Sequence, residues 1–211
     1  MRTVGNRAAA VLCGATARVA SESGGKATGM PGAAKLAQLV ERQEPLTFRF
    51  ADDGLVPNHP RWPMIVYRGA VMLPDDVNPA SVFEDLFSTN GWGDSWRNGI
   101  YDYVHYHSRI HEVLGIARGT AEVRFGGDRG EVLTVKAGDV AILPAGTGHH
   151  RLSSSADLLV VGAYPPFGTY DLCTRREQHA EALRTIPKVA RPEKDPVYGS
   201  EGPLLSVWQE G

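Results

Sequence analysis

The chain has 211 residues, of which 42% are hydrophobic and 22% charged, a balance typical of a globular rather than a disordered protein. Its net charge of −2 gives no basic excess for nucleic acid, and the apolar run Ala8–Ala15 is far shorter than the ~20 residues of a membrane-spanning helix. Two cysteines cannot make a disulfide framework. We therefore expect a cytoplasmic protein that binds neither nucleic acid nor a membrane.

The first 43 residues differ in composition from the rest. Alanine, glycine, serine and threonine dominate them up to Met30. Their arginines and the patch Ala8–Ala15 resemble a signal or transit peptide, whereas the shortness of the patch favours a flexible tail or a start of translation at Met30. A short amphipathic helix is predicted near their end by Leu36, Leu39 and Val40. We expect 1–43 to be a flexible or weakly helical extension and 44–211 to be a single domain.

The first elements predicted in this domain are an edge strand and a helix. Pro60 and Pro63 lie near the start of the apolar run Trp62–Val71, and proline in a strand is typical of sheet edges. Asn78 followed by Pro79 is typical of the start of a helix. One face of that helix is predicted to pack in the core through Val82, Phe83, Leu86 and Phe87.

From Tyr101 to Tyr164, short apolar segments alternate with turns that contain glycine or proline. The segments of strand length are Ala121–Phe125, Glu131–Val135, Val140–Leu143 and Leu158–Ala163. Their even spacing predicts an antiparallel sandwich or barrel. The C-terminal part, 166–211, is predicted to form a helix over about Leu172–Thr185 and a tail that packs back onto the barrel through Leu204, Leu205 and Trp208. The fold class is therefore mainly β with a few flanking helices.

Five of the 7 histidines fall between positions 105 and 150, namely His105, His107, His111, His149 and His150. Alternate residues of a strand share a face, so His105 and His107 point the same way. If the face of the next strand that carries Glu112 also points inward, Glu112 meets the two imidazoles and His111 points away. A tight turn then brings His149 to the same cluster. Imidazole and carboxylate groups together are ligands for divalent transition metals.

The spacing of these residues resembles the two sequence motifs of the cupin superfamily. Every spacing of the first motif is met by Gly99, His105, His107, Glu112 and Gly119. The second is met by Gly138, Pro144, Gly146 and His149. That motif usually ends with asparagine, and Ser153 stands in its place, which puts only a local hydrogen bond in doubt. The motifs span 99–153. The amino-acid sequence around them, over about 45–210, resembles a group of bacterial single-domain cupins with no assigned reaction.

The resemblance implies a double-stranded β-helix, or jelly-roll barrel, that holds one divalent metal such as Fe, Mn, Ni or Zn. The expected metal ligands are His105, His107, Glu112 and His149. Two functions stay open: a metal-dependent enzyme of the dioxygenase or isomerase/epimerase class with a small oxygen-rich substrate, or a non-catalytic binder of a sugar or organic acid. Candidate catalytic residues are Tyr101 and Tyr103, on the face of His105, although barrel filling also accounts for them.

A homodimer is the last expectation. The resemblance implies that a second subunit covers the sheet edges and one apolar face of the barrel. The run Trp62–Tyr67, with its proline near the start, suits such an edge, and unpaired edges pair with other chains. The alternative is that residues 31–43 or the C-terminal segment cover the edge within one chain.

Overall fold

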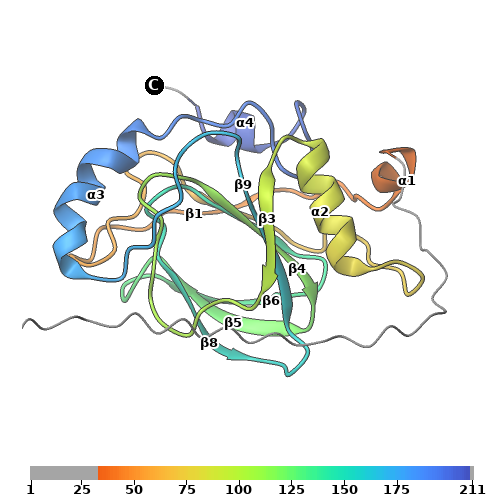
Figure 1. Ribbon diagram of the computed structural model, residues 1–211, viewed down its shortest axis with the longest axis horizontal. Coiled ribbons are helices and arrows are strands. Elements are labelled where there is room, and N and C mark those ends of the chain that lie inside the picture. The colour runs from red at the N-terminus through yellow and green to blue at the C-terminus, as the bar shows by residue number, and fades with distance from the viewer. Residues whose placement is uncertain (1–32, 210–211) are drawn as a thin grey trace, which may run out of the picture.

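A computed structural model describes residues 33–209 of the chain (Figure 1). The alternatives for the N-terminal extension, a signal or transit peptide, a flexible tail or a start at Met30, fall on residues outside that range. Within it, no helix has both the length and the apolar character that crossing a membrane requires.

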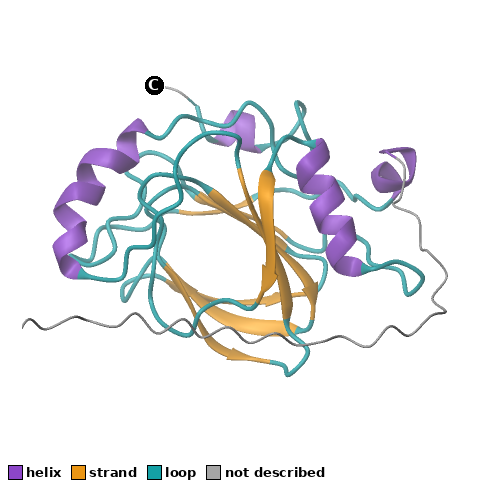
Figure 2. Ribbon diagram, in the orientation of Figure 1, coloured by secondary structure: helices purple, strands orange, loops and turns teal. Residues whose placement is uncertain are grey.

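The architecture consists of two antiparallel sheets with helices on the outside (Figure 2). The larger sheet has 6 strands in the order β1-β2-β7-β4-β9-β3. Their bounds are Leu46–Phe48, Met64–Tyr67, Val140–Leu143, Glu112–Arg118, Leu159–Tyr164 and Gly93–Asn98. The smaller sheet has 3 strands in the order β6-β5-β8, with bounds Glu131–Lys136, Thr120–Phe125 and His149–Ser154. The mainly β prediction is confirmed, and the described strands form two open sheets rather than one closed cylinder.

The inner core lies between the two sheets. Along β4, side chains alternate between the two faces, as the period of two requires. Leu114 and Ile116 pack inward against Val123 and Phe125 of β5. Val113 instead belongs to the outer core, which lies under the helices. Glu112 lies two residues before Leu114 on β4 and therefore shares this inward face, as expected.

Helix α2 (Pro79–Thr89) covers the outer face of the larger sheet and confirms the expected helix. Asn78 caps it, since its side-chain oxygen accepts hydrogen bonds from the backbone of Ala80 and Ser81 at 3.0 and 3.3 Å. Its stripe of apolar residues is buried, as predicted. Before it in the chain, helix α1 (Ala33–Gln38) packs against α2, with Leu36 buried in the same core.

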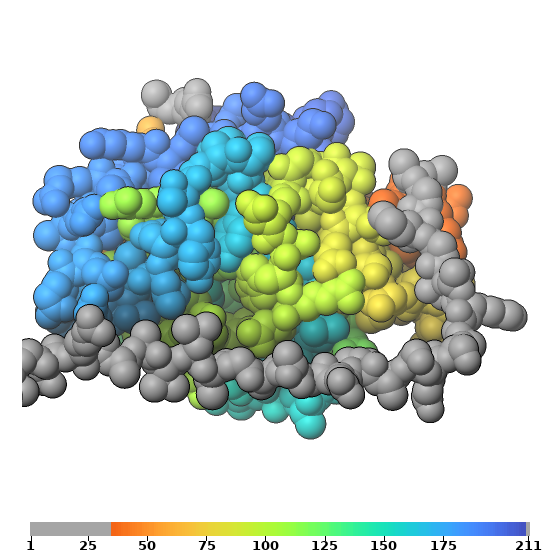
Figure 3. Space-filling model, viewed as in Figure 1, coloured from red at the N-terminus to blue at the C-terminus, as the bar shows by residue number. Residues whose placement is uncertain are grey.

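The C-terminal part contains two short 3-10 helices and two α-helices. They are η1 (Arg176–Gln178), α3 (His179–Thr185), η2 (Ile186–Lys188) and α4 (Leu204–Val207). The helix expected over about Leu172–Thr185 begins later because Cys173 forms a backbone bridge with Tyr106. The tail packs back as predicted: Trp208 is fully buried and donates a hydrogen bond to the carbonyl of Pro63 at 2.8 Å. The space-filling view shows these segments, in blue, over the left-hand side and the top of the molecule (Figure 3).

The edge strand predicted at Trp62–Val71 is wrong. Strand β2 lies between β1 and β7 and is buried along its whole length. Pro60 and Pro63 precede the first paired residue, Met64, so they interrupt no hydrogen bond of the sheet. Strand β1 covers β2 within the same chain, which removes the edge on which the homodimer was argued.

Candidate metal centre

The two histidines of the first motif lie in an extended segment between β3 and β4. The continuous strand expected from Tyr101 to His107 is absent from this part of the structure, which instead has isolated bridges from His105 to His149 and from Tyr106 to Cys173. The His105 bridge consists of two backbone hydrogen bonds, of 2.9 and 3.2 Å. Because Tyr106 pairs with Cys173 on the opposite side, His105 and His107 still share a face. This is the orientation that the alternation of side chains predicts.

The structure brings the four expected ligand residues together. One ring nitrogen each of His105, His107 and His149 lies within 4.8 Å of the other two. Glu112 Oε2 lies 3.3 Å from His107 Nε2 and 3.4 Å from His149 Nε2. All four side chains are buried. The three imidazoles therefore form one cluster, and the carboxylate lies beside two of them, His107 and His149.

Backbone carbonyls fix the orientation of the three rings. The Nδ1 atoms of His105 and His149 lie 3.2 and 3.1 Å from the carbonyls of Tyr103 and Thr147. His107 Nδ1 contacts the carbonyl of Asp171. A carbonyl only accepts, so each Nδ1 carries the hydrogen and each Nε2 is left with a lone pair. That tautomer is the one in which Nε2 binds a metal.

The cluster fits a cation. Glu112 Oε2 is buried without a hydrogen-bond partner, and it faces ring nitrogens that carry lone pairs. Burial opposes a charge on His107, but the Glu112 carboxylate outweighs it and raises the pKa of His107. Burial likewise opposes the charge of Glu112, and His107 outweighs it, which lowers the pKa of that carboxyl. Both shifts have the same electrostatic cause, which is that a positive charge is favoured beside the Glu112 carboxylate.

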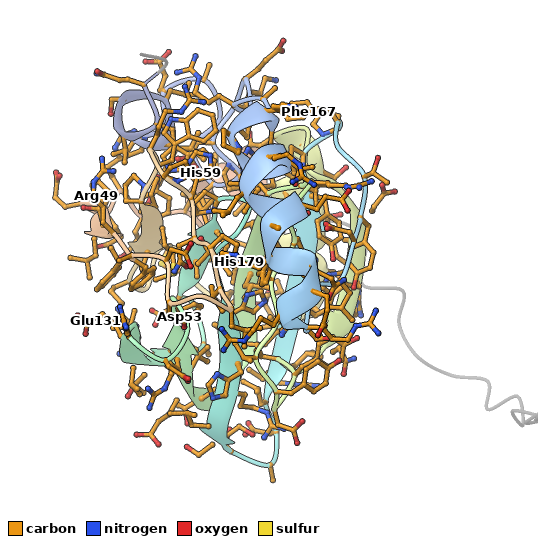
Figure 4. The ribbon with its side chains drawn as sticks, turned by 90° about the vertical axis from the view of Figure 1, so that its left-hand side faces the viewer. Arg49, Asp53, His59, Glu131, Phe167 and His179 are labelled. Carbon is orange, nitrogen blue, oxygen red and sulfur yellow. The ribbon has the colours of Figure 1, made fainter. Side chains whose placement is uncertain are left out.

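A cavity of about 550 Å³ opens over this cluster. Its walls are largely aromatic and apolar, and they include Trp96, Tyr101, Tyr164, Phe167 and Tyr170. Phe167 is labelled in Figure 4, on the loop before α3. Tyr101 and Tyr170 are 41% and 51% exposed, so they form the rim.

Of the two candidate catalytic tyrosines, only Tyr101 belongs to the described residues that line the cavity. Its ring stacks on that of Tyr103 at 4.9 Å and meets that of His105 edge-on at 5.1 Å. Both tyrosines are exposed. Their catalytic role stays a prediction.

His111 points away from the cluster, as strand parity predicts. Its Nδ1 accepts a hydrogen bond from the backbone of Ala145 at 2.8 Å, and its Nε2 lies 3.0 Å from the carbonyl of Ala190. The ring packs against both Trp62 and Trp208, whose indoles stack on one another. Burial lowers the pKa of His111 to about 4. Both nitrogens are occupied, so this histidine has none left for a metal. His150 likewise does not line the cavity.

Sequence reasoning missed two residues that support the site. The Asp171 carboxylate accepts hydrogen bonds from the backbone and hydroxyl of Ser108 at 2.9 and 2.7 Å, which places its carbonyl on His107. Tyr164 lines the same cavity as Glu112. Burial raises the pKa of Tyr164, so its hydroxyl stays protonated. The strand predicted at Leu158–Ala163 ends one residue before Tyr164, which is the last residue of β9, and only its partners in space reveal the role.

Comparison with known proteins identifies the family. The chain is 40% identical over 167 residues to the uncharacterized protein YjlB of Bacillus subtilis, a match that covers 79% of this chain and 98% of YjlB. The chain belongs to the YjlB family. Known protein-family descriptions were also searched, and none matches.

Solved structures give weaker likenesses. A Klebsiella pneumoniae protein with a double-stranded β-helix domain is 16% identical, with a TM-score of 0.32, over 75% of this chain and 100% of that one. An oxalate decarboxylase variant from Bacillus subtilis is 16% identical, with a TM-score of 0.33, over 66% and 31%. Acireductone dioxygenase from Bacillus anthracis, with cadmium in its active centre, is 14% identical, with a TM-score of 0.30, over 42% and 62%.

Proposed function

We propose that this YjlB-family cupin is a metal-dependent enzyme, of the dioxygenase or isomerase/epimerase class, that acts on a small oxygen-rich substrate. One divalent metal such as Fe, Mn, Ni or Zn would be held by His105, His107, Glu112 and His149. The observation that carries the proposal is a cluster of three buried imidazoles, two of which face a buried carboxylate oxygen without a hydrogen-bond partner, at the base of a cavity.

The residues around the cluster suit chemistry on a small ligand. Four protein ligands leave positions open on an ion that favours five or six, and a divalent ion supplies polarisation of substrate oxygens or, as Fe(II), activation of dioxygen. The aromatic walls exclude water from the ligand. Tyr164 keeps a protonated hydroxyl beside Glu112, so it offers a hydrogen bond there.

The alternative function is non-catalytic binding of a sugar or organic acid. The exposed rings of Tyr101 and Tyr170 at the rim favour it, because flat aromatic faces with a polar tip suit the mixed surface of a sugar. Turnover separates the two functions, since a binder retains its ligand unchanged.

The test is metal analysis of the whole chain, purified without a polyhistidine tag. We expect one divalent ion per chain and, in the Fe(II)-loaded protein, oxygen consumption or isomerisation on a screen of small hydroxy and keto acids and sugars. A protein that takes up no divalent ion contradicts the proposal. A protein that takes up metal and binds a screened compound without converting it supports the alternative.

A homodimer in the cytoplasm remains part of the proposal. Since β1 covers β2, the support that is left for a dimer is the cupin resemblance. Light scattering at micromolar concentration should give twice the mass of one chain, and the mass of one chain would contradict it.

A further inference from the structure

One hydroxyl in the cavity has its direction fixed by a neighbour. Trp96 Nε1 lies 2.9 Å from the hydroxyl oxygen of Tyr164. An indole nitrogen only donates, so the tyrosine oxygen accepts this bond and its own proton has to point elsewhere. Tyr164 lines the cavity together with Glu112. The proton therefore points into the cavity beside Glu112.

The position of the Trp96 indole depends on a glycine in the neighbouring strand. Trp96 of β3 pairs with Gly162 of β9, and a Cβ at Gly162 would lie 2.1 Å from Cε2 of Trp96. Because no side chain is present, the indole lies across β9. Tyr164 is two residues along β9 and so presents the same face. Gly162, Trp96 and Tyr164 thus form one arrangement that aims a hydroxyl.

We propose that Tyr164 is a positioning residue for the ligand of this cavity, donating a hydrogen bond to a negatively charged oxygen of a small carboxylate or enolate beside Glu112. The inference rests on the proposed function, because that oxygen would lie next to the metal ligands. Among the described residues that line the cavity, Arg97 is the one with a permanent positive charge, and two hydrogen bonds engage it with Glu84. The Tyr164 hydroxyl is therefore the donor with a fixed direction toward an anion.

The test uses the whole chain loaded with Co²⁺, whose visible absorption reports its ligands, and titrates it with acetate and with imidazole. Acetate carries the charged oxygen that Tyr164 would bind, whereas imidazole carries no oxygen. Tyr164→Phe should weaken acetate binding roughly tenfold, as expected for a lost hydrogen bond to a charged group. It should leave Co²⁺ uptake and imidazole affinity unchanged. A merely structural role would change both affinities together.

Two further variants sharpen the result. Trp96→Phe keeps an aromatic ring but frees the Tyr164 hydroxyl to rotate, and should weaken acetate binding about threefold. Tyr170→Phe removes another hydroxyl from the same cavity, and no tryptophan fixes the direction of that hydroxyl. This variant should change acetate affinity less than Trp96→Phe does. Acetate binding to Tyr164→Phe as tight as to the unaltered protein overturns the role of Tyr164 alone. Failure of the unaltered protein to take up Co²⁺ overturns the proposed function and this inference with it.

Discussion

The buried histidines of this protein fall into groups that use their two ring nitrogens differently. His105, His107 and His149 each give Nδ1 to a backbone carbonyl and keep Nε2 free. His111 gives both nitrogens to the backbone. The hydrogen bonds of each ring, more than its place in the sequence, therefore decide which histidine can bind a metal.

This difference predicts the outcome of a matched pair of substitutions. His107→Ala removes an imidazole from the cluster and should lower metal affinity by roughly tenfold or more, so that most bound metal is lost. His111→Ala should leave the metal content per folded chain largely unchanged, because its ring faces Trp62 and Trp208. Elemental analysis of the two purified variants measures this. Equal loss of metal from both would contradict the orientation seen here.

His59 makes stability depend on pH. Its Nδ1 accepts hydrogen bonds from the backbone of Arg61 and Trp62, and burial, with smaller contributions from nearby positive groups, lowers its pKa to about 3. Figure 4 shows this side of the molecule, with His59 and Arg49 labelled. Between pH 6.5 and about 3 the unfolded chain takes up a proton on His59 that the folded protein does not. Stability therefore falls as pH falls through this window, by up to about 1.4 kcal/mol per pH unit.

His59→Asn tests this, because the asparagine oxygen keeps an acceptor near Nδ1 but does not titrate. Urea unfolding of the metal-free protein at pH 7, 6 and 5 should give a shallower fall in the free energy of unfolding for the variant. Parallel curves for the two proteins would show that His59 does not contribute to the pH dependence.

At the scale of elements, two strands carry a glycine where a neighbouring aromatic ring lies against the backbone. On β4, a Cβ at Gly115 would lie 2.3 Å from Cδ1 of Phe83 in α2. On β9, Gly162 receives the indole of Trp96 in the same way. These glycines set how closely α2 and β3 approach the sheet.

Gly115→Ala should therefore destabilise the fold by about 1–3 kcal/mol, the usual effect of overpacking a core. Gly93→Ala is the matched control, since Gly93 also lies in a strand and a Cβ there would meet nothing within 4 Å. Urea unfolding measures both. Combining Gly115→Ala with Phe83→Leu should recover part of the loss, because residues in contact are not additive; no recovery would mean that Phe83 is not the obstacle.

Local signals account for what the sequence could predict. Helix α2 was predictable because Asn78–Pro79 and an apolar stripe lie within one short segment. The ligand cluster was predictable because motif spacing and strand parity identify its residues. The edge strand was wrong because the pairing of β2 with β1 depends on distant residues. Tyr164 was missed as a site residue for the same reason, since its role needs Trp96 on β3, a strand without an alternating apolar pattern.

At the scale of the whole molecule, the site is assembled from segments far apart in the chain and is supported by cores that do not contain it. Side chains of His105, His107, Glu112, His149 and Tyr164 line the cavity, and the carbonyl of Asp171 contacts His107. The inner core between the sheets and the outer core under the helices both form without the ligand residues. Burial of these two hydrophobic cores therefore drives folding without a bound metal ion.

Metal should stabilise the protein without being required for folding, unlike a zinc finger. An ion that binds only the folded chain raises the free energy of unfolding by mass action, and 177 described residues form a core of adequate size. Calorimetry before and after chelation should show a cooperative transition in both cases, at lower temperature without metal. A chelated protein with no cooperative transition would mean that the cluster itself holds the fold together.

Cys173 is held by a backbone bridge to Tyr106, so the reactivity of its thiol reports how often this part of the protein opens. Burial, with the Asp171 carboxylate beside it, raises the pKa of the Cys173 thiol to about 11, and the sulfur donates to Asp171 Oδ2 at 3.3 Å. A shielded, protonated thiol does not react with an alkylating reagent. In a variant with Cys13 replaced by serine, the rate at which Cys173 is alkylated would therefore measure how often the segment that carries Asp171 separates from His107.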